Sequence, residues 1–133
     1  ANTLLGKQGR DTLIGDLGND ILVGNANKDR LIGGEGDDIL KGRTGHDRLH
    51  GGKGDDTLIG GSGSDHFKLS TGKDKIKDFS IADNDQLIIK SSATLSIEEK
   101  GKHLLLSDNE NNIKTKILNI NLDELLQYQP DLI

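Results

Sequence analysis

From Gly6 to Lys68 the chain reads GKQGRDTLI GDLGNDILV GNANKDRLI GGEGDDILK GRTGHDRLH GGKGDDTLI GGSGSDHFK, seven nine-residue units in unbroken succession. Every unit has Gly at its first position, Asp at its sixth and a large apolar residue at its eighth. Six units also have Gly at the fourth position, where the third unit has Asn27, a residue that tolerates a left-handed backbone. These recurring positions predict a repeating fold for this half of the chain.

The first six positions of each unit suit a tight turn, because Gly and Asp are favoured where the backbone bends sharply. The last three, such as TLI at residues 12–14, alternate outward and inward as a short strand does. Two units then make one coil, so each unit should stack on the second unit after it. The eighth-position residues would form a thin core between two parallel sheets. They are Leu13, Leu22, Leu31, Leu40, Leu49, Leu58 and Phe67.

One apolar residue in nine buries too little surface to offset the entropy lost on ordering a glycine-rich chain. The sixth-position aspartates would lie in two lines, about 4.8 Å apart from coil to coil. One line contains Asp11, Asp29, Asp47 and Asp65, and the other contains Asp20, Asp38, Asp56 and then Asp74. Like charges at this spacing repel unless a cation lies between them. Oxygen ligands in a flexible turn, in a chain without Cys, favour Ca²⁺ over zinc or copper.

Backbone carbonyls should complete the ion sites, because alternate carbonyls of an extended turn point in opposite directions. We expect the carbonyls of positions 2 and 4 to face one ion together with the Asp, and those of positions 1, 3 and 5 to face the next. The predicted ligands of this kind are Gly9, Gly18, Asn27, Gly34, Gly36, Gly45, Gly52, Gly54, Gly61 and Gly63. Stacked pairs of units then hold about five or six ions. The weaker alternative, that the aspartates only cap turns, would not require one in every unit.

The unit pattern GGxGxDxUx is the calcium-binding nonapeptide repeat of RTX proteins. The chain therefore resembles the RTX (repeats-in-toxin, hemolysin-type calcium-binding) family over about half its length. The resemblance implies an all-β fold, a right-handed parallel β-roll or β-solenoid, which would span residues 1–77 with partial repeats at both ends. It also implies a protein secreted by the type I machinery of a Gram-negative-type bacterium, folding on Ca²⁺ binding outside the cell.

The composition agrees with a roll that depends on metal. The chain has 133 residues, of which 32% are hydrophobic and only 2% aromatic, with no Cys. Absence of Cys fits an extracellular protein stabilised by calcium instead of disulfides. No apolar run approaches the length of a membrane span, so stable membrane insertion is not expected. A nucleic-acid partner is not expected either. Ala1–Leu5 matches positions 5 to 9 of a preceding unit, so we expect the chain to be a fragment of a longer protein.

Residues 78–133 should cap the open end of the solenoid, which would otherwise expose apolar and unpaired edges. Before them, residues 69–77 form a decayed eighth unit, in which Gly72, Asp74 and Ile76 keep positions 4, 6 and 8. Asp83 and Asp85 then fall in a turn that leads to an apolar strand at Gln86–Lys90.

The remaining elements should be a hairpin, a strand and a short helix. The hairpin pairs Thr94–Glu98 with Lys102–Ser107, the strand spans Ile113–Ile120, and the helix Leu122–Tyr128 is capped by Asn121 with Glu124 and stopped by Pro130. This region resembles the C-terminal part of RTX-bearing secreted proteases and of the R-modules of mannuronan epimerases. Asp131–Ile133 is similar to a type I secretion signal, and a solvated tail explains it equally well.

No catalytic constellation is recognisable in the sequence. It has neither an HExxH helix nor a GxSxG elbow, and without Cys a thiol nucleophile is excluded. The four His residues fall on predicted turns or outward positions. We therefore expect no enzymatic activity from this chain, and any such activity would belong to a domain upstream of it.

The outward positions of the odd-numbered units predict a basic sheet face. Its residues are Arg30, Arg48, His50, His66 and Lys68. Such a face suits an anionic polysaccharide, as is thought for the R-modules that this chain resembles, and a merely solubilising surface is the alternative. The even-numbered units are more apolar outside, with Ile21, Val23 and Ile39, and we expect the C-terminal segment to cover that face.

Overall fold

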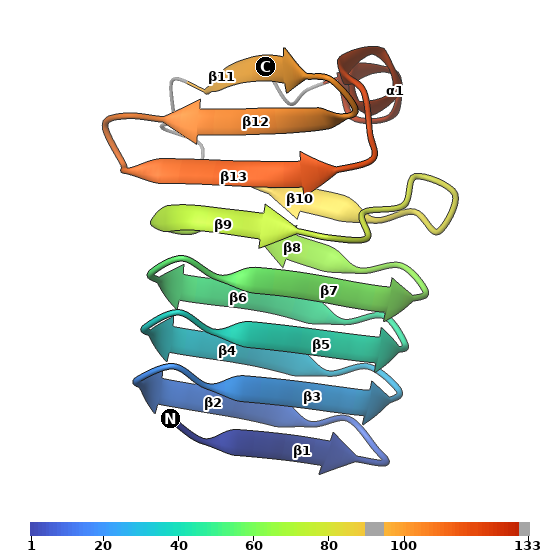
Figure 1. Ribbon diagram of the computed structural model, residues 1–133. Helices are drawn as coiled ribbons and strands as arrows, with labels where there is room; N and C mark the ends of the chain where they lie inside the picture. The colour runs from blue at the N-terminus through green and yellow to red at the C-terminus, as the bar shows by residue number, and fades with distance from the viewer. Residues whose placement is uncertain (90–94, 131–133) are drawn as a thin grey trace.

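A computed structural model describes residues 1–89 and 95–130 of the chain. Its strands stack as successive coils from the N-terminus toward a C-terminal cap that carries the single helix of these residues (Figure 1). The strands are β1 (Thr3–Lys7), β2 (Thr12–Leu17), β3 (Ile21–Ala26), β4 (Arg30–Glu35), β5 (Ile39–Thr44), β6 (Arg48–Lys53), β7 (Thr57–Ser62), β8 (His66–Lys68), β9 (Gly72–Ile76), β10 (Gln86–Ile88), β11 (Ser96–Lys100), β12 (His103–Asp108) and β13 (Ile113–Leu118). The helix is α1 (Leu122–Tyr128).

The strands form two sheets in which odd and even strands separate. The first has the order β1-β3-β5-β7-β9-β13-β12-β11 and the second the order β10-β8-β6-β4-β2. Within the roll, neighbours are parallel and eighteen residues apart, as in the pairs Leu22↔Leu40 and Leu31↔Leu49. The predicted stacking of each unit on the second unit after it is therefore confirmed.

The strands of the roll are longer than the three residues predicted from the pattern. Most span six residues, from position 7 of one unit to position 3 of the next, as in β2. Pairing passes the glycine of position 1 and resumes at position 2, where Asp16 pairs with Gly34. It can resume because the residue at position 2 takes a positive φ, 71° for Asp16 and 121° for Gly34. The tight turn is thus confined to positions 4 to 6.

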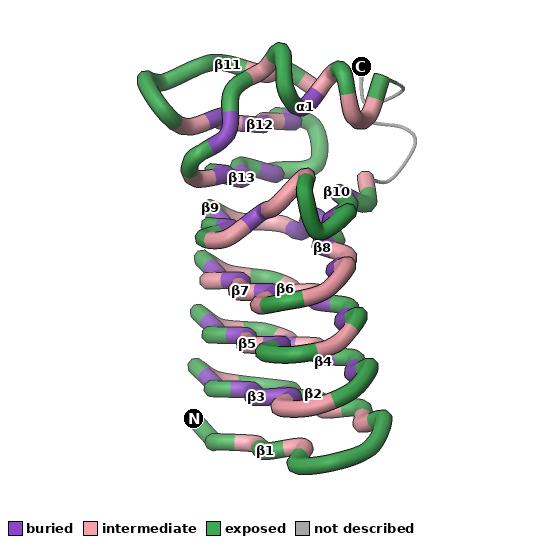
Figure 2. The backbone as a smooth tube through the Cα atoms, turned by 90° about the vertical axis from the view of Figure 1, so that its right-hand side faces the viewer, coloured by how far each residue is buried: buried purple, intermediate pink, exposed green. Residues whose placement is uncertain are grey.

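The core is the predicted column of eighth-position residues, which lies between the two sheets. Figure 2 shows buried residues, in purple, recurring along the stacked strands. Leu31, Leu40 and Phe67 are completely buried, whereas Leu13 at the first coil is only partly buried. The column continues into the cap through Ile76 and the residues that the cap supplies. Those are Phe79, Leu87, Leu104, Leu106, Ile113, Ile117, Ile120 and Leu125.

The cap is built as expected, with small shifts at its boundaries. The hairpin is β11 and β12, paired antiparallel, and the apolar strand is β10, which adds to the second sheet beside β8. Asn121 accepts a hydrogen bond from the backbone of Glu124 and forms a complete capping box for α1. The start of the predicted hairpin at Thr94, the end of the predicted strand at Lys90 and the tail Asp131–Ile133 lie outside the described residues.

One expectation about the cap is wrong. Among the residues that the structure describes, the C-terminal segment does not cover the apolar outer face of the even-numbered units. Instead β13 pairs with β9, so β13, β12 and β11 prolong the first sheet beyond the last coil. The edge of β9 offers unpaired backbone groups, which another strand satisfies better than a face can. Ile21 and Ile39 consequently keep 38% and 36% of their surface exposed.

Candidate metal centre

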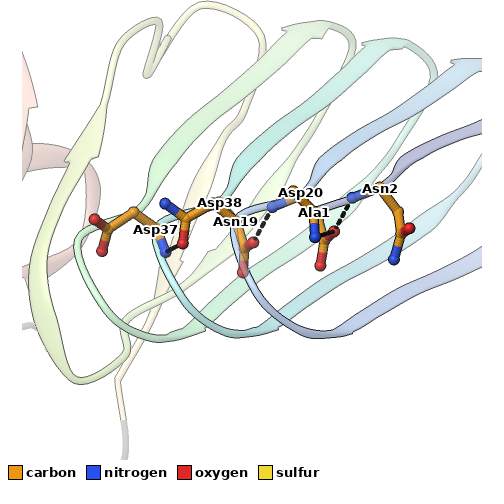
Figure 3. Close-up of polar contacts among 6 residues, drawn as sticks. All are labelled: Ala1, Asn2, Asn19, Asp20, Asp37 and Asp38. Atoms are coloured by element: carbon orange, nitrogen blue, oxygen red, sulfur yellow. Dashed lines mark hydrogen bonds and ion pairs between the residues drawn. The ribbon is translucent and has the colours of Figure 1, made fainter.

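Two columns of aspartates run along the roll at its two edges. In each column, one carboxylate oxygen accepts the backbone N–H of the aspartate one coil earlier, as in Asp20 N–H to Asp38 Oδ1 at 2.7 Å (Figure 3). The same bond recurs from Asp11 to Asp29, from Asp29 to Asp47, from Asp38 to Asp56, from Asp47 to Asp65 and from Asp56 to Asp74. Asn2 makes it to Asp20 in the first partial unit. The Oδ1 atoms are therefore occupied by the backbone.

The second carboxylate oxygen of each repeat aspartate has no partner among residues 1–89 and 95–130. These buried Oδ2 atoms belong to Asp11, Asp20, Asp29, Asp38, Asp47, Asp56 and Asp65. Six of these side chains are almost fully buried, and only Asp11, at the open end, is intermediate. A buried carboxylate oxygen without a donor is costly. One such atom in each full unit indicates a group that the protein itself does not supply.

The glycine at position 1 lets that oxygen lie directly against the backbone, where a side chain would clash with it. A methyl group added to Gly15 would lie 2.7 Å from Asp20 Oδ2 and 2.5 Å from the carbonyl oxygen of Gly33. The same two kinds of oxygen converge beside Gly6, at 2.7 Å from Asp11 Oδ2 and 2.6 Å from Gly24 O. Two oxygen acceptors thus lie close together beside each of these glycines, and the carboxylate oxygen has no donor, which favours a nearby cation.

The carbonyls of the turn alternate in direction. Those of positions 2 and 4 point toward the following coil, as Gly34 O does toward Gly52 and Gly36 O toward Gly54. The carbonyl of position 3 points the other way, because Lys53 O accepts the N–H of Gly36 at 2.8 Å. Positive φ values at positions 2 and 4 produce this alternation, and Asn27 shares them with a φ of 77°. Oxygens from both coils therefore face the gap between them.

The carboxylate columns are electrostatically unfavourable without a cation. Burial, with a smaller contribution from neighbouring carboxylates, raises the pKa of Asp56 and of Asp65 to about 7. Burial also raises the pKa of the carboxyls of Asp29, Asp38 and Asp47. Within the described part of the chain, no three Asp, Glu, His or Cys side chains cluster closely enough to hold a metal ion by themselves. An ion here needs backbone carbonyls as well, a donor set of hard oxygens that suits Ca²⁺.

Sequence reasoning missed one member of the columns. Asp85, expected to be a turn residue, is 1% exposed, and its Oδ1 accepts the N–H of Asp65 at 2.9 Å. It extends the column of Asp65 as Asp74 extends that of Asp56. Asp85 follows Asp65 by 20 residues, whereas the earlier aspartates of this column recur every 18 residues, so the repeat pattern did not reveal it. Asp83 lies in an exposed turn, as expected.

The five residues of the predicted basic face come together on the second sheet. Arg30, Arg48 and His66 are aligned across β4, β6 and β8, as are Ile32, His50 and Lys68. Together they line a surface hollow of about 360 Å³, floored by Leu31 and Leu49. Burial and the adjacent cations lower the pKa of His50 and of His66, so Arg30, Arg48 and Lys68 carry the positive charge at neutral pH.

A second basic surface, along one turn edge, was not predicted. The fifth positions of odd-numbered units are Arg10, Lys28, His46 and Ser64, whereas those of even-numbered units are Asn19, Asp37, Asp55 and Lys73. Arg10 and Lys28 share a further hollow with Arg30 and Arg48, so this edge is continuous with the basic face. The alternation of the fifth position in the sequence would have revealed it.

Comparison with known proteins agrees with this geometry. A family model described as the RTX calcium-binding nonapeptide repeat (4 copies) matches residues 1–31 and again residues 32–67. Among solved structures, the chain is similar to the solution structure of the AlgE6R3 subunit from the Azotobacter vinelandii mannuronan C5-epimerase. The identity is 26%, the TM-score 0.57, and the match covers 78% of this chain and 72% of that one. No curated protein matches the chain. In the described residues, no helix has the length and hydropathy of a membrane span.

Proposed function

The chain belongs to the RTX calcium-binding nonapeptide repeat family, and we propose that it is a calcium-stabilised β-roll that folds when the ion binds. The observation that carries the proposal is the set of seven buried Oδ2 atoms without a donor, one in each full unit, along the two aspartate columns. Bound Ca²⁺ would supply the positive charge that these atoms lack. Because the ion binds only the folded roll, its binding free energy becomes folding free energy.

The ligands that we propose are the carboxylates of the seven repeat aspartates and the backbone carbonyls of the turns around them. The carbonyl donors include those of the residues at positions 2 and 4, from Gly9 to Gly63, with Asn27 replacing glycine once. About five or six ions would lie between stacked units, counting one for each pair of units that are two apart. Asp74, in the decayed eighth unit, differs from the others because its Oδ2 accepts a hydrogen bond from Ser70.

The proposed role is that of a non-catalytic module of a larger secreted protein. At the low calcium concentration of the cytosol, repulsion along the two carboxylate columns would keep the chain unfolded. That state suits export through a type I secretion channel, and extracellular calcium would then fold the roll. This proposal rests on the family and on the metal dependence that the unpartnered oxygens imply.

Circular dichroism of chelated protein, titrated with CaCl₂ and separately with MgCl₂, tests the proposal. We expect a cooperative transition from coil to β structure with calcium and none with magnesium, which demands a rigid octahedral site. Asp38→Asn should raise the calcium midpoint. The matched control is Asp37→Asn, because Asp37 is the adjacent residue but is exposed. Full β signal in the presence of chelator would refute calcium-driven folding.

A second candidate function is recognition of an anionic polysaccharide by the basic face. Arg30, Arg48 and Lys68 line one hollow, and the structurally similar subunit is part of a mannuronan C5-epimerase. Guanidinium groups bind carboxylates through two parallel hydrogen bonds, so a polymer of acidic sugars fits this surface. Calcium loading would add positive charge to the roll and strengthen the attraction.

Affinity electrophoresis of calcium-loaded protein in gels that contain polymannuronate tests this candidate. The double variant Arg30→Gln, Arg48→Gln should lose retardation in the gel. The control, Lys75→Gln with Lys77→Gln, removes the same charge from exposed residues in and just after β9 of the other sheet. An equal loss of retardation in the two double variants would show that only net charge matters. Unchanged retardation of both variants would eliminate the face as a site.

A further inference from the structure

Each carboxylate column ends at the cap with a carboxylate that the protein satisfies by itself. Asp74 Oδ2 accepts the hydroxyl of Ser70 at 2.8 Å, and Asp85 Oδ2 accepts the backbone N–H of Ser80 at 2.8 Å. Both aspartates are as deeply buried as the earlier members, at 3% and 1% exposed. The seven earlier members have no donor at this atom. The difference therefore lies in the contacts and not in the depth of burial.

The residue five places before each aspartate changes at the same two points. It is glycine before every one of the seven repeat aspartates, but it is Leu69 before Asp74 and Ser80 before Asp85. A side chain at this position occupies the space beside Oδ2, since a methyl group on Gly15 would lie 2.7 Å from Asp20 Oδ2. Leu69 is buried, at 6% exposed. At the cap a residue with a side chain thus replaces the glycine that the repeats keep beside each carboxylate.

The column of Asp74 also has no acidic successor. The pairing of β13 with β9 aligns Thr115 with Asp74, so a neutral hydroxyl stands where the next carboxylate would be. Near the end of the other column, beside Asp65, the carboxylate of Asp78 is also satisfied by protein donors. One of its carboxylate oxygens accepts the N–H of Gly60, eighteen residues earlier, at 2.9 Å. The other accepts the N–H of Gly61, seventeen residues earlier, at 2.7 Å. Protein donors and acceptors thus replace further coils.

We propose that Ser70 and Ser80 terminate the two calcium columns, so that Asp74 and Asp85 hold their coils through protein donors and bind no ion of their own. The inference rests on the proposed calcium binding and defines where it stops. It also narrows the ligand set predicted from the repeat pattern, which includes Asp74. In this chain, an aspartate that binds calcium has glycine five residues before it, whereas Asp74 and Asp85, which end the columns without an ion, do not.

Counting bound ions by native mass spectrometry in saturating CaCl₂ tests the proposal. Asp56→Asn and Asp74→Asn are a matched pair, because both residues belong to one column, on adjacent coils, and both are buried. We expect Asp56→Asn to lose at least one ion and Asp74→Asn to lose none. The amide that Asp74→Asn introduces can still hydrogen-bond to the Ser70 hydroxyl, so the calcium midpoint of this variant should shift less than twofold.

A second pair tests the other column. Asp65→Asn should lose at least one ion, whereas Asp85→Asn should bind as many ions as the unchanged protein once folded at high calcium. Loss of an ion from Asp74→Asn or Asp85→Asn, to the same extent as from its partner variant, would overturn the proposal. If Asp74→Asn does not fold, Ser70→Ala replaces it and should bind the same number of ions with a raised midpoint. Failure of the unchanged protein to bind calcium would instead refute the proposed function.

Discussion

The repeats (residues 6–68) and the cap (residues 69–130) share one continuous sheet, yet different interactions stabilise them. The repeats bury one large side chain per unit and leave seven carboxylate oxygens without a donor. The cap buries a larger set of apolar residues, and the carboxylates of Asp74, Asp85 and Asp108 accept hydrogen bonds from neighbouring groups. The buried carboxylates of the repeats therefore need a cation, whereas those of the cap are satisfied by protein donors.

The largest expected effect of this difference follows removal of calcium. We expect chelation to release the amides of β3 and β5 to rapid hydrogen exchange, because the carboxylate columns repel when the ions leave. Amides of β12 and β13 should keep more of their protection, because apolar burial holds them. Hydrogen exchange with mass spectrometry, with and without EDTA, measures both. Equal loss of protection in the two regions would show that the cap depends on the loaded roll.

The second-largest effect should come from shortening a buried core side chain, which should have different consequences in the repeats and in the cap. Leu40→Ala and Leu104→Ala remove fully buried side chains of the same kind, and each change typically costs about 2–5 kcal/mol of unfolding free energy. In the repeats that loss has to be offset by calcium binding, so Leu40→Ala should raise the calcium midpoint. Leu104→Ala should mainly reduce the exchange protection of the cap in EDTA. Identical midpoints for the two variants would contradict separate stabilisation.

The metal-free repeats and the hairpin of the cap should also respond to pH with opposite signs, although burial raises the pKa of Asp74 and Asp85 at the start of the cap as it does in the repeats. Asp56 and Asp65 have their pKa raised by burial to about 7, above the usual value near 3.9 in an unfolded chain. Protonation of these groups stabilises the metal-free roll, so that stabilisation is complete below about pH 4 and is lost as pH rises through 7. In the hairpin, hydrogen bonds from Asn111 lower the pKa of Asp108, so its contribution to stability is present above about pH 4 and is lost as pH falls below that value.

Amide exchange of chelated protein between pH 2.5 and pH 8, corrected for intrinsic exchange rates, measures this divergence. Protection of β5 should fall as pH rises, while that of β12 should not. Asp108→Asn is the control, since it should remove the acid sensitivity of the cap alone. With calcium present the sign for the roll should reverse, because protons compete with the ion for the carboxylates. Protection of the metal-free roll that increased with pH would contradict the raised pKa values.

How well the sequence predicts each region follows the same division. In the repeats, the period of nine residues specified the coil, the core column and the alignment of the aspartates, all of which the structure has. The predicted strands were too short. The pattern does not reveal that residues at position 2, such as Asp16, resume strand pairing after the glycine because they adopt a positive φ. The fixed period constrains topology more strongly than it constrains local hydrogen bonding.

At the junction the period fails as a guide. Asp85 follows Asp65 by 20 residues, and a periodic search therefore places it in a turn although it is buried in the column. The direction in which the cap grows was also missed, because strand pairing to the edge of β9 is a non-local choice. Local signals in the cap were reliable where the chemistry is local, as in the capping box of Asn121 and Glu124.

The smallest expected effect comes from that capping box. Asn121→Ala removes the side-chain oxygen that accepts the Glu124 N–H at 2.8 Å, a change that costs about 1 kcal/mol of helix stability. Because α1 contributes buried Leu125 to the cap core and nothing to the carboxylate columns, the loss should appear as faster amide exchange in α1. Gln127→Ala, an exposed position in the same helix, should change exchange little. A raised calcium midpoint in Asn121→Ala would mean that even this distant helix shares in the folding of the roll, and that the two regions form one cooperative unit.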